Sequence, residues 1–403
     1  MTPSYDALLG LSTGDSFGAQ FFVPDNRHHL TERQLPPGPW PWTDDTEMAC
    51  SVHAALSERG GVDTFDLTHA FARRHDFDRG YGPAANRLLR LVREGGDARE
   101  LAAALFDGQG SYGNGAAMRV APLGAAYAAD PALAVEPATA TAVITHTHPQ
   151  AVAGAVAVAV AAAYAVRART GPTTPERFLR DVLALTPDGA VRRGIAEAVT
   201  LLGEPDHRTA ARLLGNGRLV SAADTVPFAL WAAARNLGDY PSALWETVSA
   251  GGDVDTTAAI VGGVVAAHTG AAGIPAEWLA AAEPLPDWAF PAPGSVAGPR
   301  GEAILRPEPV PVPELHWTDR DWQRVRHGLR PRTMEDRWLG FTEEGVLHLR
   351  RSWTGHGIFA VRVRPVRGGG WRPESAVAES EPGRFGLPGP GRAELLATLL
   401  RGL

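Results

Sequence analysis

The chain contains no lysine, so all 38 of its Lys and Arg residues are arginines, in a sequence of 403 residues. Without lysine there is no Schiff-base or pyridoxal-phosphate site, no phosphate-binding GK[ST] loop and no protein-kinase active site. The single cysteine, Cys50, excludes internal disulfides and cysteine-based zinc clusters, and it fits a reducing cytoplasm. The 13 histidines are scattered and form no zinc-binding pattern such as HExxH.

The sequence also lacks an excess of positive charge and a long apolar segment. Its formal net charge is −7 and its pI is near 6.0, which argues against general nucleic-acid binding. The amino-terminal segment has no basic start followed by an apolar run, so it is not a secretory signal. The apolar segment 151–166 is shorter than the roughly 20 residues of a membrane span, and we expect a buried helix there. We therefore predict a cytoplasmic protein without membrane association.

Composition divides the chain into three parts. Residues 1–283 are rich in Ala, Leu, Val and Arg, and short segments with Gly, Pro and Asp interrupt them. This pattern predicts an all-α multi-helix domain. Residues 284–313 are dense in proline and predict an extended linker. Residues 314–403 predict a small α+β domain. Helices are expected at 44–58, 81–93, 151–169, 175–185 and 255–268.

The carboxy-terminal part changes in periodicity. Segments 344–353 and 357–365 alternate apolar and polar residues, as half-buried strands do. Segments 318–329 and 391–403 have helical patterns. Tryptophan and arginine are frequent here, and we interpret them as parts of a compact core rather than as a partner surface.

Two acidic clusters lie where loops enter helices. The first is Trp42-Thr43-Asp44-Asp45-Thr46-Glu47, and the second is Gly251-Gly252-Asp253-Val254-Asp255-Thr256-Thr257. Adjacent carboxylates repel each other unless cations neutralise them. Oxygen donors without Cys or His favour Mg²⁺, Mn²⁺ or Ca²⁺. The alternative interpretation is two unrelated helix caps, because Asp and Thr are favoured at that position in any protein.

The charges of the two clusters match a pair of divalent cations. Asp44, Asp45, Asp253 and Asp255 carry one negative charge each, four in all, which two doubly charged ions would balance. The two clusters are about 200 residues apart, so only the fold can bring them together. The sequence alone predicts two sets of oxygen ligands, but it does not show that the two clusters meet in the fold.

Five segments in a fixed order resemble the ADP-ribosylglycohydrolase family, which includes the dinitrogenase-reductase-activating enzymes. They are GDSFGAQF (14–21), WTDDT (42–46), SYGNGAAMRVAPLG (111–124), THTHP (145–149) and GGDVDTTAAIVGG (251–263). The resemblance covers nearly all of residues 1–283 and implies an all-α fold with two Mg²⁺ or Mn²⁺ ions. It implies as substrate an ADP-ribose joined through its anomeric carbon to an amino-acid side chain or another acceptor. The metal ligands it implies are Thr43, Asp44, Asp45, Asp253, Asp255 and Thr256.

Other residues are expected to line the same site. The segment Ser111-Tyr112-Gly113-Asn114-Gly115 offers backbone amides and close approach to a diphosphate, although it also fits a plain turn before a helix. By resemblance, His146 lies near the substrate and Asp78 is a candidate general base, although Asp78 also fits an exposed loop aspartate. Asp45 and Asp255 are the other catalytic candidates. Two further interpretations are that Asp15 holds the first helix against the site and that Arg119 contacts an anion or forms a structural ion pair to a helix end.

The sequence departs from the family pattern at one position. Many members carry a catalytic glutamate a few residues beyond the GDxxG motif, where this chain has Phe22. Phenylalanine can neither bind a metal nor move a proton. Another acid fills the role, or the branch prefers a different linkage, or the protein binds ADP-ribose without hydrolysing it. A two-metal nucleotide phosphohydrolase is a further alternative, since paired cations serve that reaction equally well.

Overall fold

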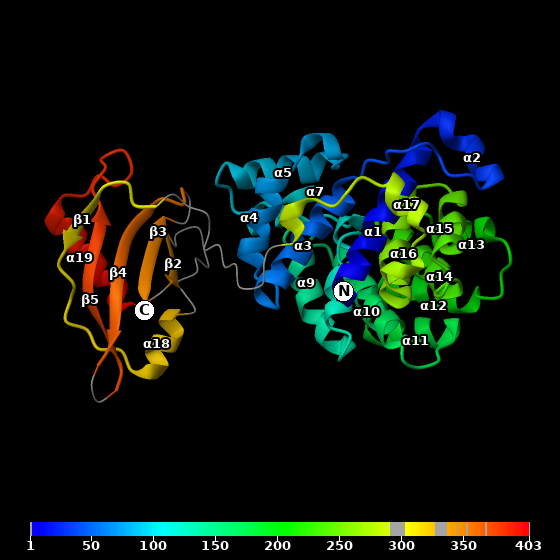
Figure 1. Ribbon diagram of the computed structural model, residues 1–403. Coiled ribbons are helices and arrows are strands. Elements are labelled where there is room, and N and C mark those ends of the chain that lie inside the picture. The colour runs from blue at the N-terminus through cyan, green and yellow to red at the C-terminus, as the bar shows by residue number, and fades with distance from the viewer. Residues whose placement is uncertain are drawn as a thin grey trace. The chain divides into compact units, whose positions relative to one another are not determined.

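The computed structural model describes residues 2–290, 303–326, 337–343, 345–351, 354–366 and 369–402. The chain forms two compact units, Met1–Ser295 and Val296–Leu403. The first is built of helices, and the second holds an antiparallel sheet with helices (Figure 1). The predicted fold class, an all-α unit followed by a small α+β unit, is confirmed.

The helices of the first unit follow one another along the chain with short connections. They are α1 Pro3–Ala19, α2 Arg27–Glu32, α3 Asp44–Arg59, α4 Thr64–Arg74, α5 Pro83–Arg93, α6 Ala98–Ala103, α7 Leu105–Gly108, α8 Ala121–Ala126, α9 Val135–Ala142, α10 Pro149–Arg167, α11 Pro175–Leu185, α12 Ala190–Thr200, α13 His207–Leu214, α14 Ala222–Arg235, α15 Tyr240–Ser249, α16 Val254–Thr269 and α17 Ala276–Ala281. The five helices expected from the sequence are α3, α5, α10, α11 and α16. Helices α5, α10 and α11 begin at proline, which lacks the backbone N–H that the first helical turn leaves unpaired.

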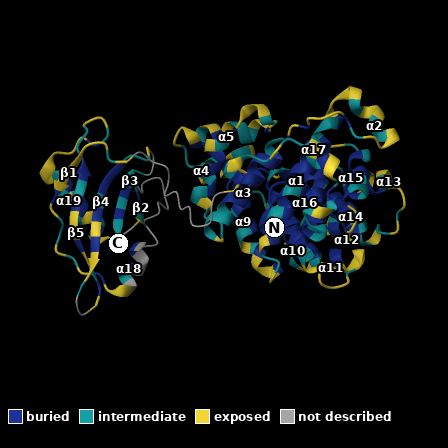
Figure 2. Cartoon of the chain, in the orientation of Figure 1, coloured by how far each residue is buried: buried dark blue, intermediate teal, exposed yellow. Residues whose placement is uncertain are grey.

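Glycines bring α1 and α16 into close contact. Gly10, Gly14 and Gly18 recur at a spacing of four residues, which places them on one face of α1. A Cβ atom at Gly14 would lie 2.2 Å from the Ala258 carbonyl oxygen, and one at Gly10 would lie 2.4 Å from the Gly262 carbonyl oxygen. The two helix backbones can come this close only because glycine has no side chain. Both helices are mostly buried in the middle of the unit (Figure 2).

Helix α10 is a second buried element of the first unit. It is long and apolar enough to cross a membrane by length and composition alone, yet 72% of its most apolar window is buried. Gly124 of α8 lets the two helices come close, since a Cβ atom there would lie 1.9 Å from the Ala159 carbonyl oxygen. The segment 151–166 therefore forms the buried helix that its composition predicts.

The second unit is a five-stranded antiparallel sheet with strand order β1-β5-β4-β3-β2. Its elements are β1 Pro307–Val310, α18 Asp319–Arg326, β2 Trp338–Glu343, β3 Val346–Arg351, β4 Gly357–Pro365, β5 Trp371–Glu379 and α19 Gly389–Arg401. Strands β3 and β4 and helix α18 lie in the segments whose patterns predict them, and α19 begins two residues before its predicted segment 391–403. Residues 327–329 of the predicted helix 318–329 lie outside the described residues.

The predicted linker 284–313 is described at its two ends, while its residues 291–302 lie outside the described residues. Pro284 accepts a hydrogen bond from the indole N–H of Trp42, and the Trp288 ring lies 4.0 Å from the guanidinium carbon of Arg74, both in the helical unit. At the other end of the range, β1 is an edge strand paired with β5. Prolines are tolerated in β1 because one side of an edge strand needs no N–H donors.

Tryptophans form part of the core of the second unit. The rings of Trp317 and Trp322 are buried, and Trp322 stacks on Trp371 with centroids 5.0 Å apart. The guanidinium of Arg351 lies 4.4 Å from the ring of Trp338. Aromatic and arginine side chains thus pack together in this small unit, as we interpret their frequency in the sequence.

The helix contact at Gly14 makes a testable prediction about stability. Gly14→Ala should lower the free energy of unfolding by about 1–3 kcal/mol, because the methyl group meets a backbone carbonyl that cannot rotate away. Helix propensity alone would favour alanine by about 1 kcal/mol. A loss of stability would therefore reflect the close contact between the helices. Gly203→Ala is the control, since nothing lies within 4 Å of its Cβ position. Denaturant unfolding of both variants checks this, and equal stabilities would contradict the packing.

Candidate metal centre and substrate pocket

Three helices bring carboxylates to one point. Asp15 lies in the last turns of α1, Asp45 in the first turn of α3 and Asp255 in the first turn of α16. One carboxylate oxygen of each lies within 4.8 Å of the others. Segments that are distant in sequence therefore converge as a metal site requires.

Asp15 connects α1 to the start of α3. Its Oδ2 accepts hydrogen bonds from the backbone N–H of Thr43 at 2.9 Å and from the hydroxyl of Thr46 at 2.6 Å. Its Oδ1 accepts from the Thr43 hydroxyl at 2.8 Å. These bonds satisfy N–H groups that the first turn of α3 leaves unpaired. Asp15 thus holds α1 against the site as expected, and it also belongs to the acidic cluster.

Asp253, Thr256 and Asp44 complete the ligand set predicted from the sequence. Asp253 is the N-cap residue of α16, and its Oδ2 accepts a hydrogen bond from the Asn114 side-chain amide at 2.7 Å. The N–H of Thr256 donates to Asp255 Oδ1 at 2.8 Å. Asp44 lies beside the turn that ends at Gly80, where a Cβ atom would be 3.8 Å from Asp44 Oδ1. The predicted ligands therefore stand at the starts of two helices, α3 and α16.

The cluster resists full ionisation. Burial, and then the negative charge of Asp15, raises the pKa of Asp44 to about 8. Burial and Asp15 also raise the pKa of Asp45 well above its usual range, and burial with the charge of Asp253 does the same for Asp255. Removing several carboxylates from water while they repel one another favours their neutral forms.

The donor set fits divalent cations. Asp45 is 1% exposed, and its Oδ1 has no hydrogen-bond partner among the described residues. A buried carboxylate oxygen without a donor is costly unless a cation approaches it. Every candidate ligand atom is a carboxylate or hydroxyl oxygen, which suits Mg²⁺ or Mn²⁺. The residues present therefore fit a metal.

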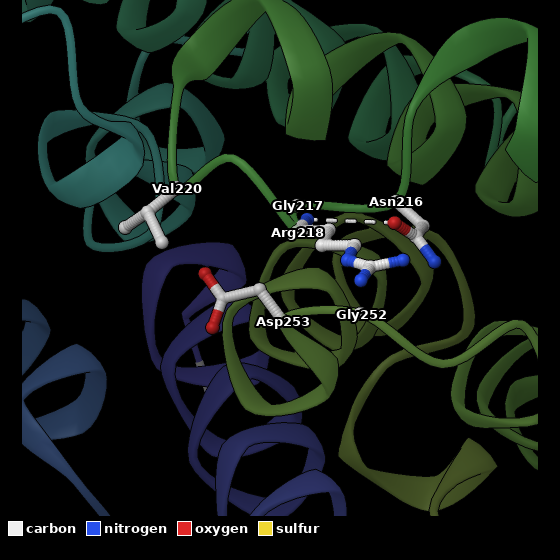
Figure 3. Close-up of a pocket in the computed structure, with 6 residues that line it drawn as sticks. All are labelled: Asn216, Gly217, Arg218, Val220, Gly252 and Asp253. Carbon is white, nitrogen blue, oxygen red and sulfur yellow. Dashed lines mark hydrogen bonds between the residues drawn. The ribbon is translucent and has the colours of Figure 1, made fainter.

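A pocket of about 440 Å³ adjoins Asp253 (Figure 3). It lies between the loop that follows α13 and the residues that enter α16, and its lining comprises Asn216, Gly217, Arg218, Val220, Gly252 and Asp253. The loop is tied down, because the Asn216 carbonyl accepts from the N–H of Asp253 at 3.0 Å. Gly217 has a φ of +83°, and a Cβ atom there would lie 2.5 Å from Asp253 Cβ. The pocket wall thus rests directly on a candidate ligand.

The segment 111–115 pairs with this loop. Asn114 N–H donates to the Val220 carbonyl at 3.3 Å, and the Tyr112 carbonyl accepts from the N–H of Ala222 at 3.0 Å. The Ser111 hydroxyl accepts from the N–H of Gly113 at 3.2 Å. All five residues of the predicted diphosphate-binding segment therefore lie on one stretch that is joined to Asp253 through the Asn114 side chain.

His146 lies against the two glycines of that segment. Cβ atoms at Gly113 and Gly115 would lie 3.2 Å and 3.0 Å from His146 Nε2. Burial, and then the positive charge of Arg119, lowers the pKa of His146 to about 3, so its imidazole is neutral at physiological pH. The structure thus brings His146 together with the predicted substrate segment.

Asp78 lies in a different environment. It belongs to an exposed turn, Phe77–Arg79, and its carboxylate makes no hydrogen bond or ion pair with the described residues. The turn is held by Arg79, which pairs with Glu283 at 2.7 Å. Gly80 follows it beside Asp44. Asp78 therefore borders the centre without joining the acidic cluster and stays a candidate base.

The sequence analysis assigned no supporting role to two groups, although Glu47 belongs to the first acidic cluster. Glu47 is buried, and it accepts hydrogen bonds from the Tyr81 hydroxyl at 2.6 Å and from the N–H of Asp76 at 3.1 Å, which positions the exposed turn. The loop 216–220 was not singled out either. A Gly-rich stretch, LGNG, marks it in the sequence, but nothing local to it points to Asp253.

Comparison with known proteins agrees with this geometry. Residues 4–298 match the family model described as ADP-ribosylglycohydrolase. The chain is similar to human ADP-ribosylhydrolase ARH3, with 31% identity over 277 residues that cover 60% of this chain and 74% of the human protein. It is also similar to the ADP-ribosyl-[dinitrogen reductase] glycohydrolase of Rhodospirillum rubrum, with 30% identity over 31% of this chain and 45% of that protein. A solved structure described as "ADP-ribosylglycohydrolase-related protein complex" matches with a TM-score of 0.50 and 29% identity, covering 70% of this chain and 92% of that one.

The raised pKa of Asp44 predicts how pH affects the metal-free protein. The pKa rises from an ordinary 3.8 to about 8 on folding, so its stabilising contribution is present at low pH and is lost as the pH rises through 8. Thermal unfolding in a chelator should give a lower Tm at pH 8.5 than at pH 6. Mg²⁺ or Mn²⁺ should raise the Tm more at pH 8.5, because a cation replaces protons on the carboxylates.

Asp44→Asn provides the control for this measurement. The amide cannot titrate, so the Tm of the chelated variant should depend less on pH than that of the unaltered protein. A Tm of the chelated, unaltered protein that stays constant or rises from pH 6 to pH 8.5 would contradict the assignment.

Proposed function

Because the chain belongs to the ADP-ribosylglycohydrolase family, we propose that it uses two divalent cations, Mg²⁺ or Mn²⁺, to cleave the bond between the anomeric carbon of ADP-ribose and an acceptor. The chain is an enzyme of this class, and its reaction is hydrolysis of a glycosidic bond to ADP-ribose. The observation that carries the proposal is the convergence of Asp15, Asp45 and Asp255 from three helices beside a pocket.

Six residues would hold the cations. They are Thr43, Asp44, Asp45, Asp253, Asp255 and Thr256. The four aspartates supply four negative charges, which supports two doubly charged ions. The Thr43 hydroxyl donates its hydrogen to Asp15 and accepts from the N–H of Asp45, so one lone pair of the oxygen remains available to a cation. When bound, such ions supply Lewis-acid stabilisation of negative charge on oxygen and acidify water.

The substrate would lie across the pocket and the segment 111–115. The glycines of this segment leave space for a diphosphate, and His146 Nε2 lies beside them. The exposed rings of Tyr112 and Phe106, with centroids 5.7 Å apart, offer aromatic faces on which a base can stack. In this arrangement the ribose diol lies at the acidic cluster and the anomeric carbon faces the carboxylates that remain available for proton transfer.

Phe22 changes which group can move the proton. It lies in the turn Gln20–Phe22 directly after α1, half exposed and without a polar atom. The end of α1 touches the start of α16, since a Cβ atom at Gly18 would lie 2.8 Å from Asp255 Cα. By the family resemblance, an acid at position 22 would serve this centre. Without it, proton transfer falls to Asp45, Asp78 or Asp255.

Product analysis tests the proposed reaction. With ADP-ribosyl-serine, ADP-ribosyl-arginine or an ADP-ribose 1″-ester, the enzyme should release free ADP-ribose in the presence of Mg²⁺ or Mn²⁺. Asp255→Asn should lower kcat/KM at least about 100-fold, because it removes a ligand from the centre. The control is Asp239→Asn, an exposed N-cap of α15 away from the cluster, which should leave kcat/KM unchanged. Release of phosphate or AMP instead would identify a phosphohydrolase, and retained turnover in Asp255→Asn would reject the metal centre.

Restoring an acid at position 22 tests how the enzyme works without one. Phe22→Glu should raise kcat about tenfold or more, since a positioned general acid or base typically contributes a factor of 10²–10⁴. Val23→Glu adds the same charge at a neighbouring exposed position and should leave kcat unchanged. Steady-state kinetics with one substrate compares them. Equal rates for Phe22→Glu and the unaltered enzyme would mean that the remaining aspartates already supply the base.

A further inference from the structure

Arg119 is a buried cation that the proposed chemistry leaves without a role. Its side chain is 0% exposed, and it makes no ion pair with a carboxylate among the described residues. It packs against the Phe71 ring, with 4.7 Å from the guanidinium carbon to the ring centroid. Burying a charge without a counter-ion costs several kcal/mol, so such a residue calls for an explanation.

The hydrogen bonds of Arg119 lead to His146. One guanidinium nitrogen, Nη2, donates to the Thr141 carbonyl at 2.8 Å and to the Thr145 hydroxyl oxygen at 3.0 Å. The same hydroxyl lies 2.7 Å from His146 Nδ1. Thr145 is 2% exposed, so water does not compete for these contacts. The three side chains form one chain of hydrogen bonds that ends at the imidazole.

Arginine fixes the direction of that chain. A guanidinium has only donors, so the Thr145 oxygen must accept from Arg119. The single hydroxyl hydrogen of Thr145 is then left for His146 Nδ1. The opposite arrangement, with Nδ1–H donating to Thr145, would leave the buried hydroxyl hydrogen unpaired at a cost of about 1–3 kcal/mol. Nδ1 is therefore the acceptor, and the proton of the neutral ring lies on Nε2.

The space in front of Nε2 is kept open. Cβ atoms at Gly113 and Gly115 would lie 3.2 Å and 3.0 Å from this nitrogen, so any larger residue at either position would cover it. Nε2 makes no hydrogen bond with the described residues. The low pKa of His146, caused by burial and by the charge of Arg119, keeps the ring neutral, so the direction of the single N–H matters at every working pH.

We propose that Arg119 is a positioning residue, which through Thr145 holds His146 in the tautomer protonated at Nε2 and so aims this N–H at an acceptor oxygen of the substrate between Gly113 and Gly115. The role of this N–H rests on the proposed binding of ADP-ribose at the site. The tautomer itself does not, because it follows from contacts within the chain.

The tautomer is measured in the ligand-free protein. ¹⁵N-histidine labelling separates protonated from unprotonated ring nitrogens, and loss of its signals in His146→Gln identifies the ring among the 13 histidines. The unaltered protein should show an unprotonated Nδ1 and a protonated Nε2. Thr145→Val, which removes the hydroxyl and keeps the shape, should shift the ring to a mixture of tautomers. Thr145→Ser should restore the original state.

A variant on the same segment provides the matched control. Thr139→Val removes a hydroxyl of α9 that donates only to the Val135 carbonyl at 2.9 Å, so the His146 signals should not change. A protonated Nδ1 in the unaltered protein would overturn the proposal. So would His146 signals that are the same in Thr145→Val as in the unaltered protein.

Ligand affinity tests the purpose of the arrangement. Calorimetric titration with ADP-ribose should give a Kd about tenfold higher for Thr145→Val, a Kd restored by Thr145→Ser and an unchanged Kd for Thr139→Val. An unchanged Kd in Thr145→Val, despite an altered tautomer, would overturn the positioning role. If the unaltered protein shows the expected tautomer but does not bind ADP-ribose at all, the proposed function fails, while the assignment of Arg119 to the tautomer is upheld.

Discussion

The close contact between α1 and α16 is the constraint on which the site depends. Backbone atoms of the two helices meet without intervening side chains at Gly10, Gly14 and Gly18. Asp15 directly follows one of these glycines, and Asp255 lies against another. If larger residues separated the helices, the two carboxylates would move apart with them. The geometry of the acidic cluster is thus set by the direct packing of these two helices against each other, which is rigid.

The fold holds together a cluster that destabilises it. Carboxylates gathered in a buried site cost free energy until cations bind, and their raised pKa values record this cost. Rigid surroundings offset it. Phe17 lies two residues after Asp15 and packs its ring 4.9 Å from Trp245 and 4.3 Å from Trp278, measured between centroids. Arg119 adds a fixed positive charge whose field reaches Asp44. The packed core therefore offsets the free-energy cost of the buried carboxylates, as is usual for binding sites.

Local sequence patterns predicted the helices and the types of metal ligand, but not the long-range contacts that hold the site residues in place. Helical periodicity and capping residues placed α3, α10 and α16 within about two residues, because those signals are local. The proline-rich β1 was missed, since only its pairing with β5 makes it a strand. The contacts of Asn114 with Asp253 and of Arg119 with Thr145 join residues 139 and 26 positions apart. Such long-range contacts produce no periodic pattern in one sequence. The family resemblance, and not the spacing of residues, predicted that the two acidic clusters converge.

Helix ends carry the candidate cation ligands, whereas loops form the proposed substrate wall. The candidate cation ligands stand on the first turns of α3 and α16, which packing fixes. The proposed substrate wall consists of the segment 111–115 and the loop 216–220, and it contacts the candidate ligand Asp253 through Asn114, Asn216 and Gly217. Loops of this kind accept substitution without disturbing the core. Phe22 lies in the turn Gln20–Phe22 after α1, outside the helical turns that carry Asp15, Asp45 and Asp255.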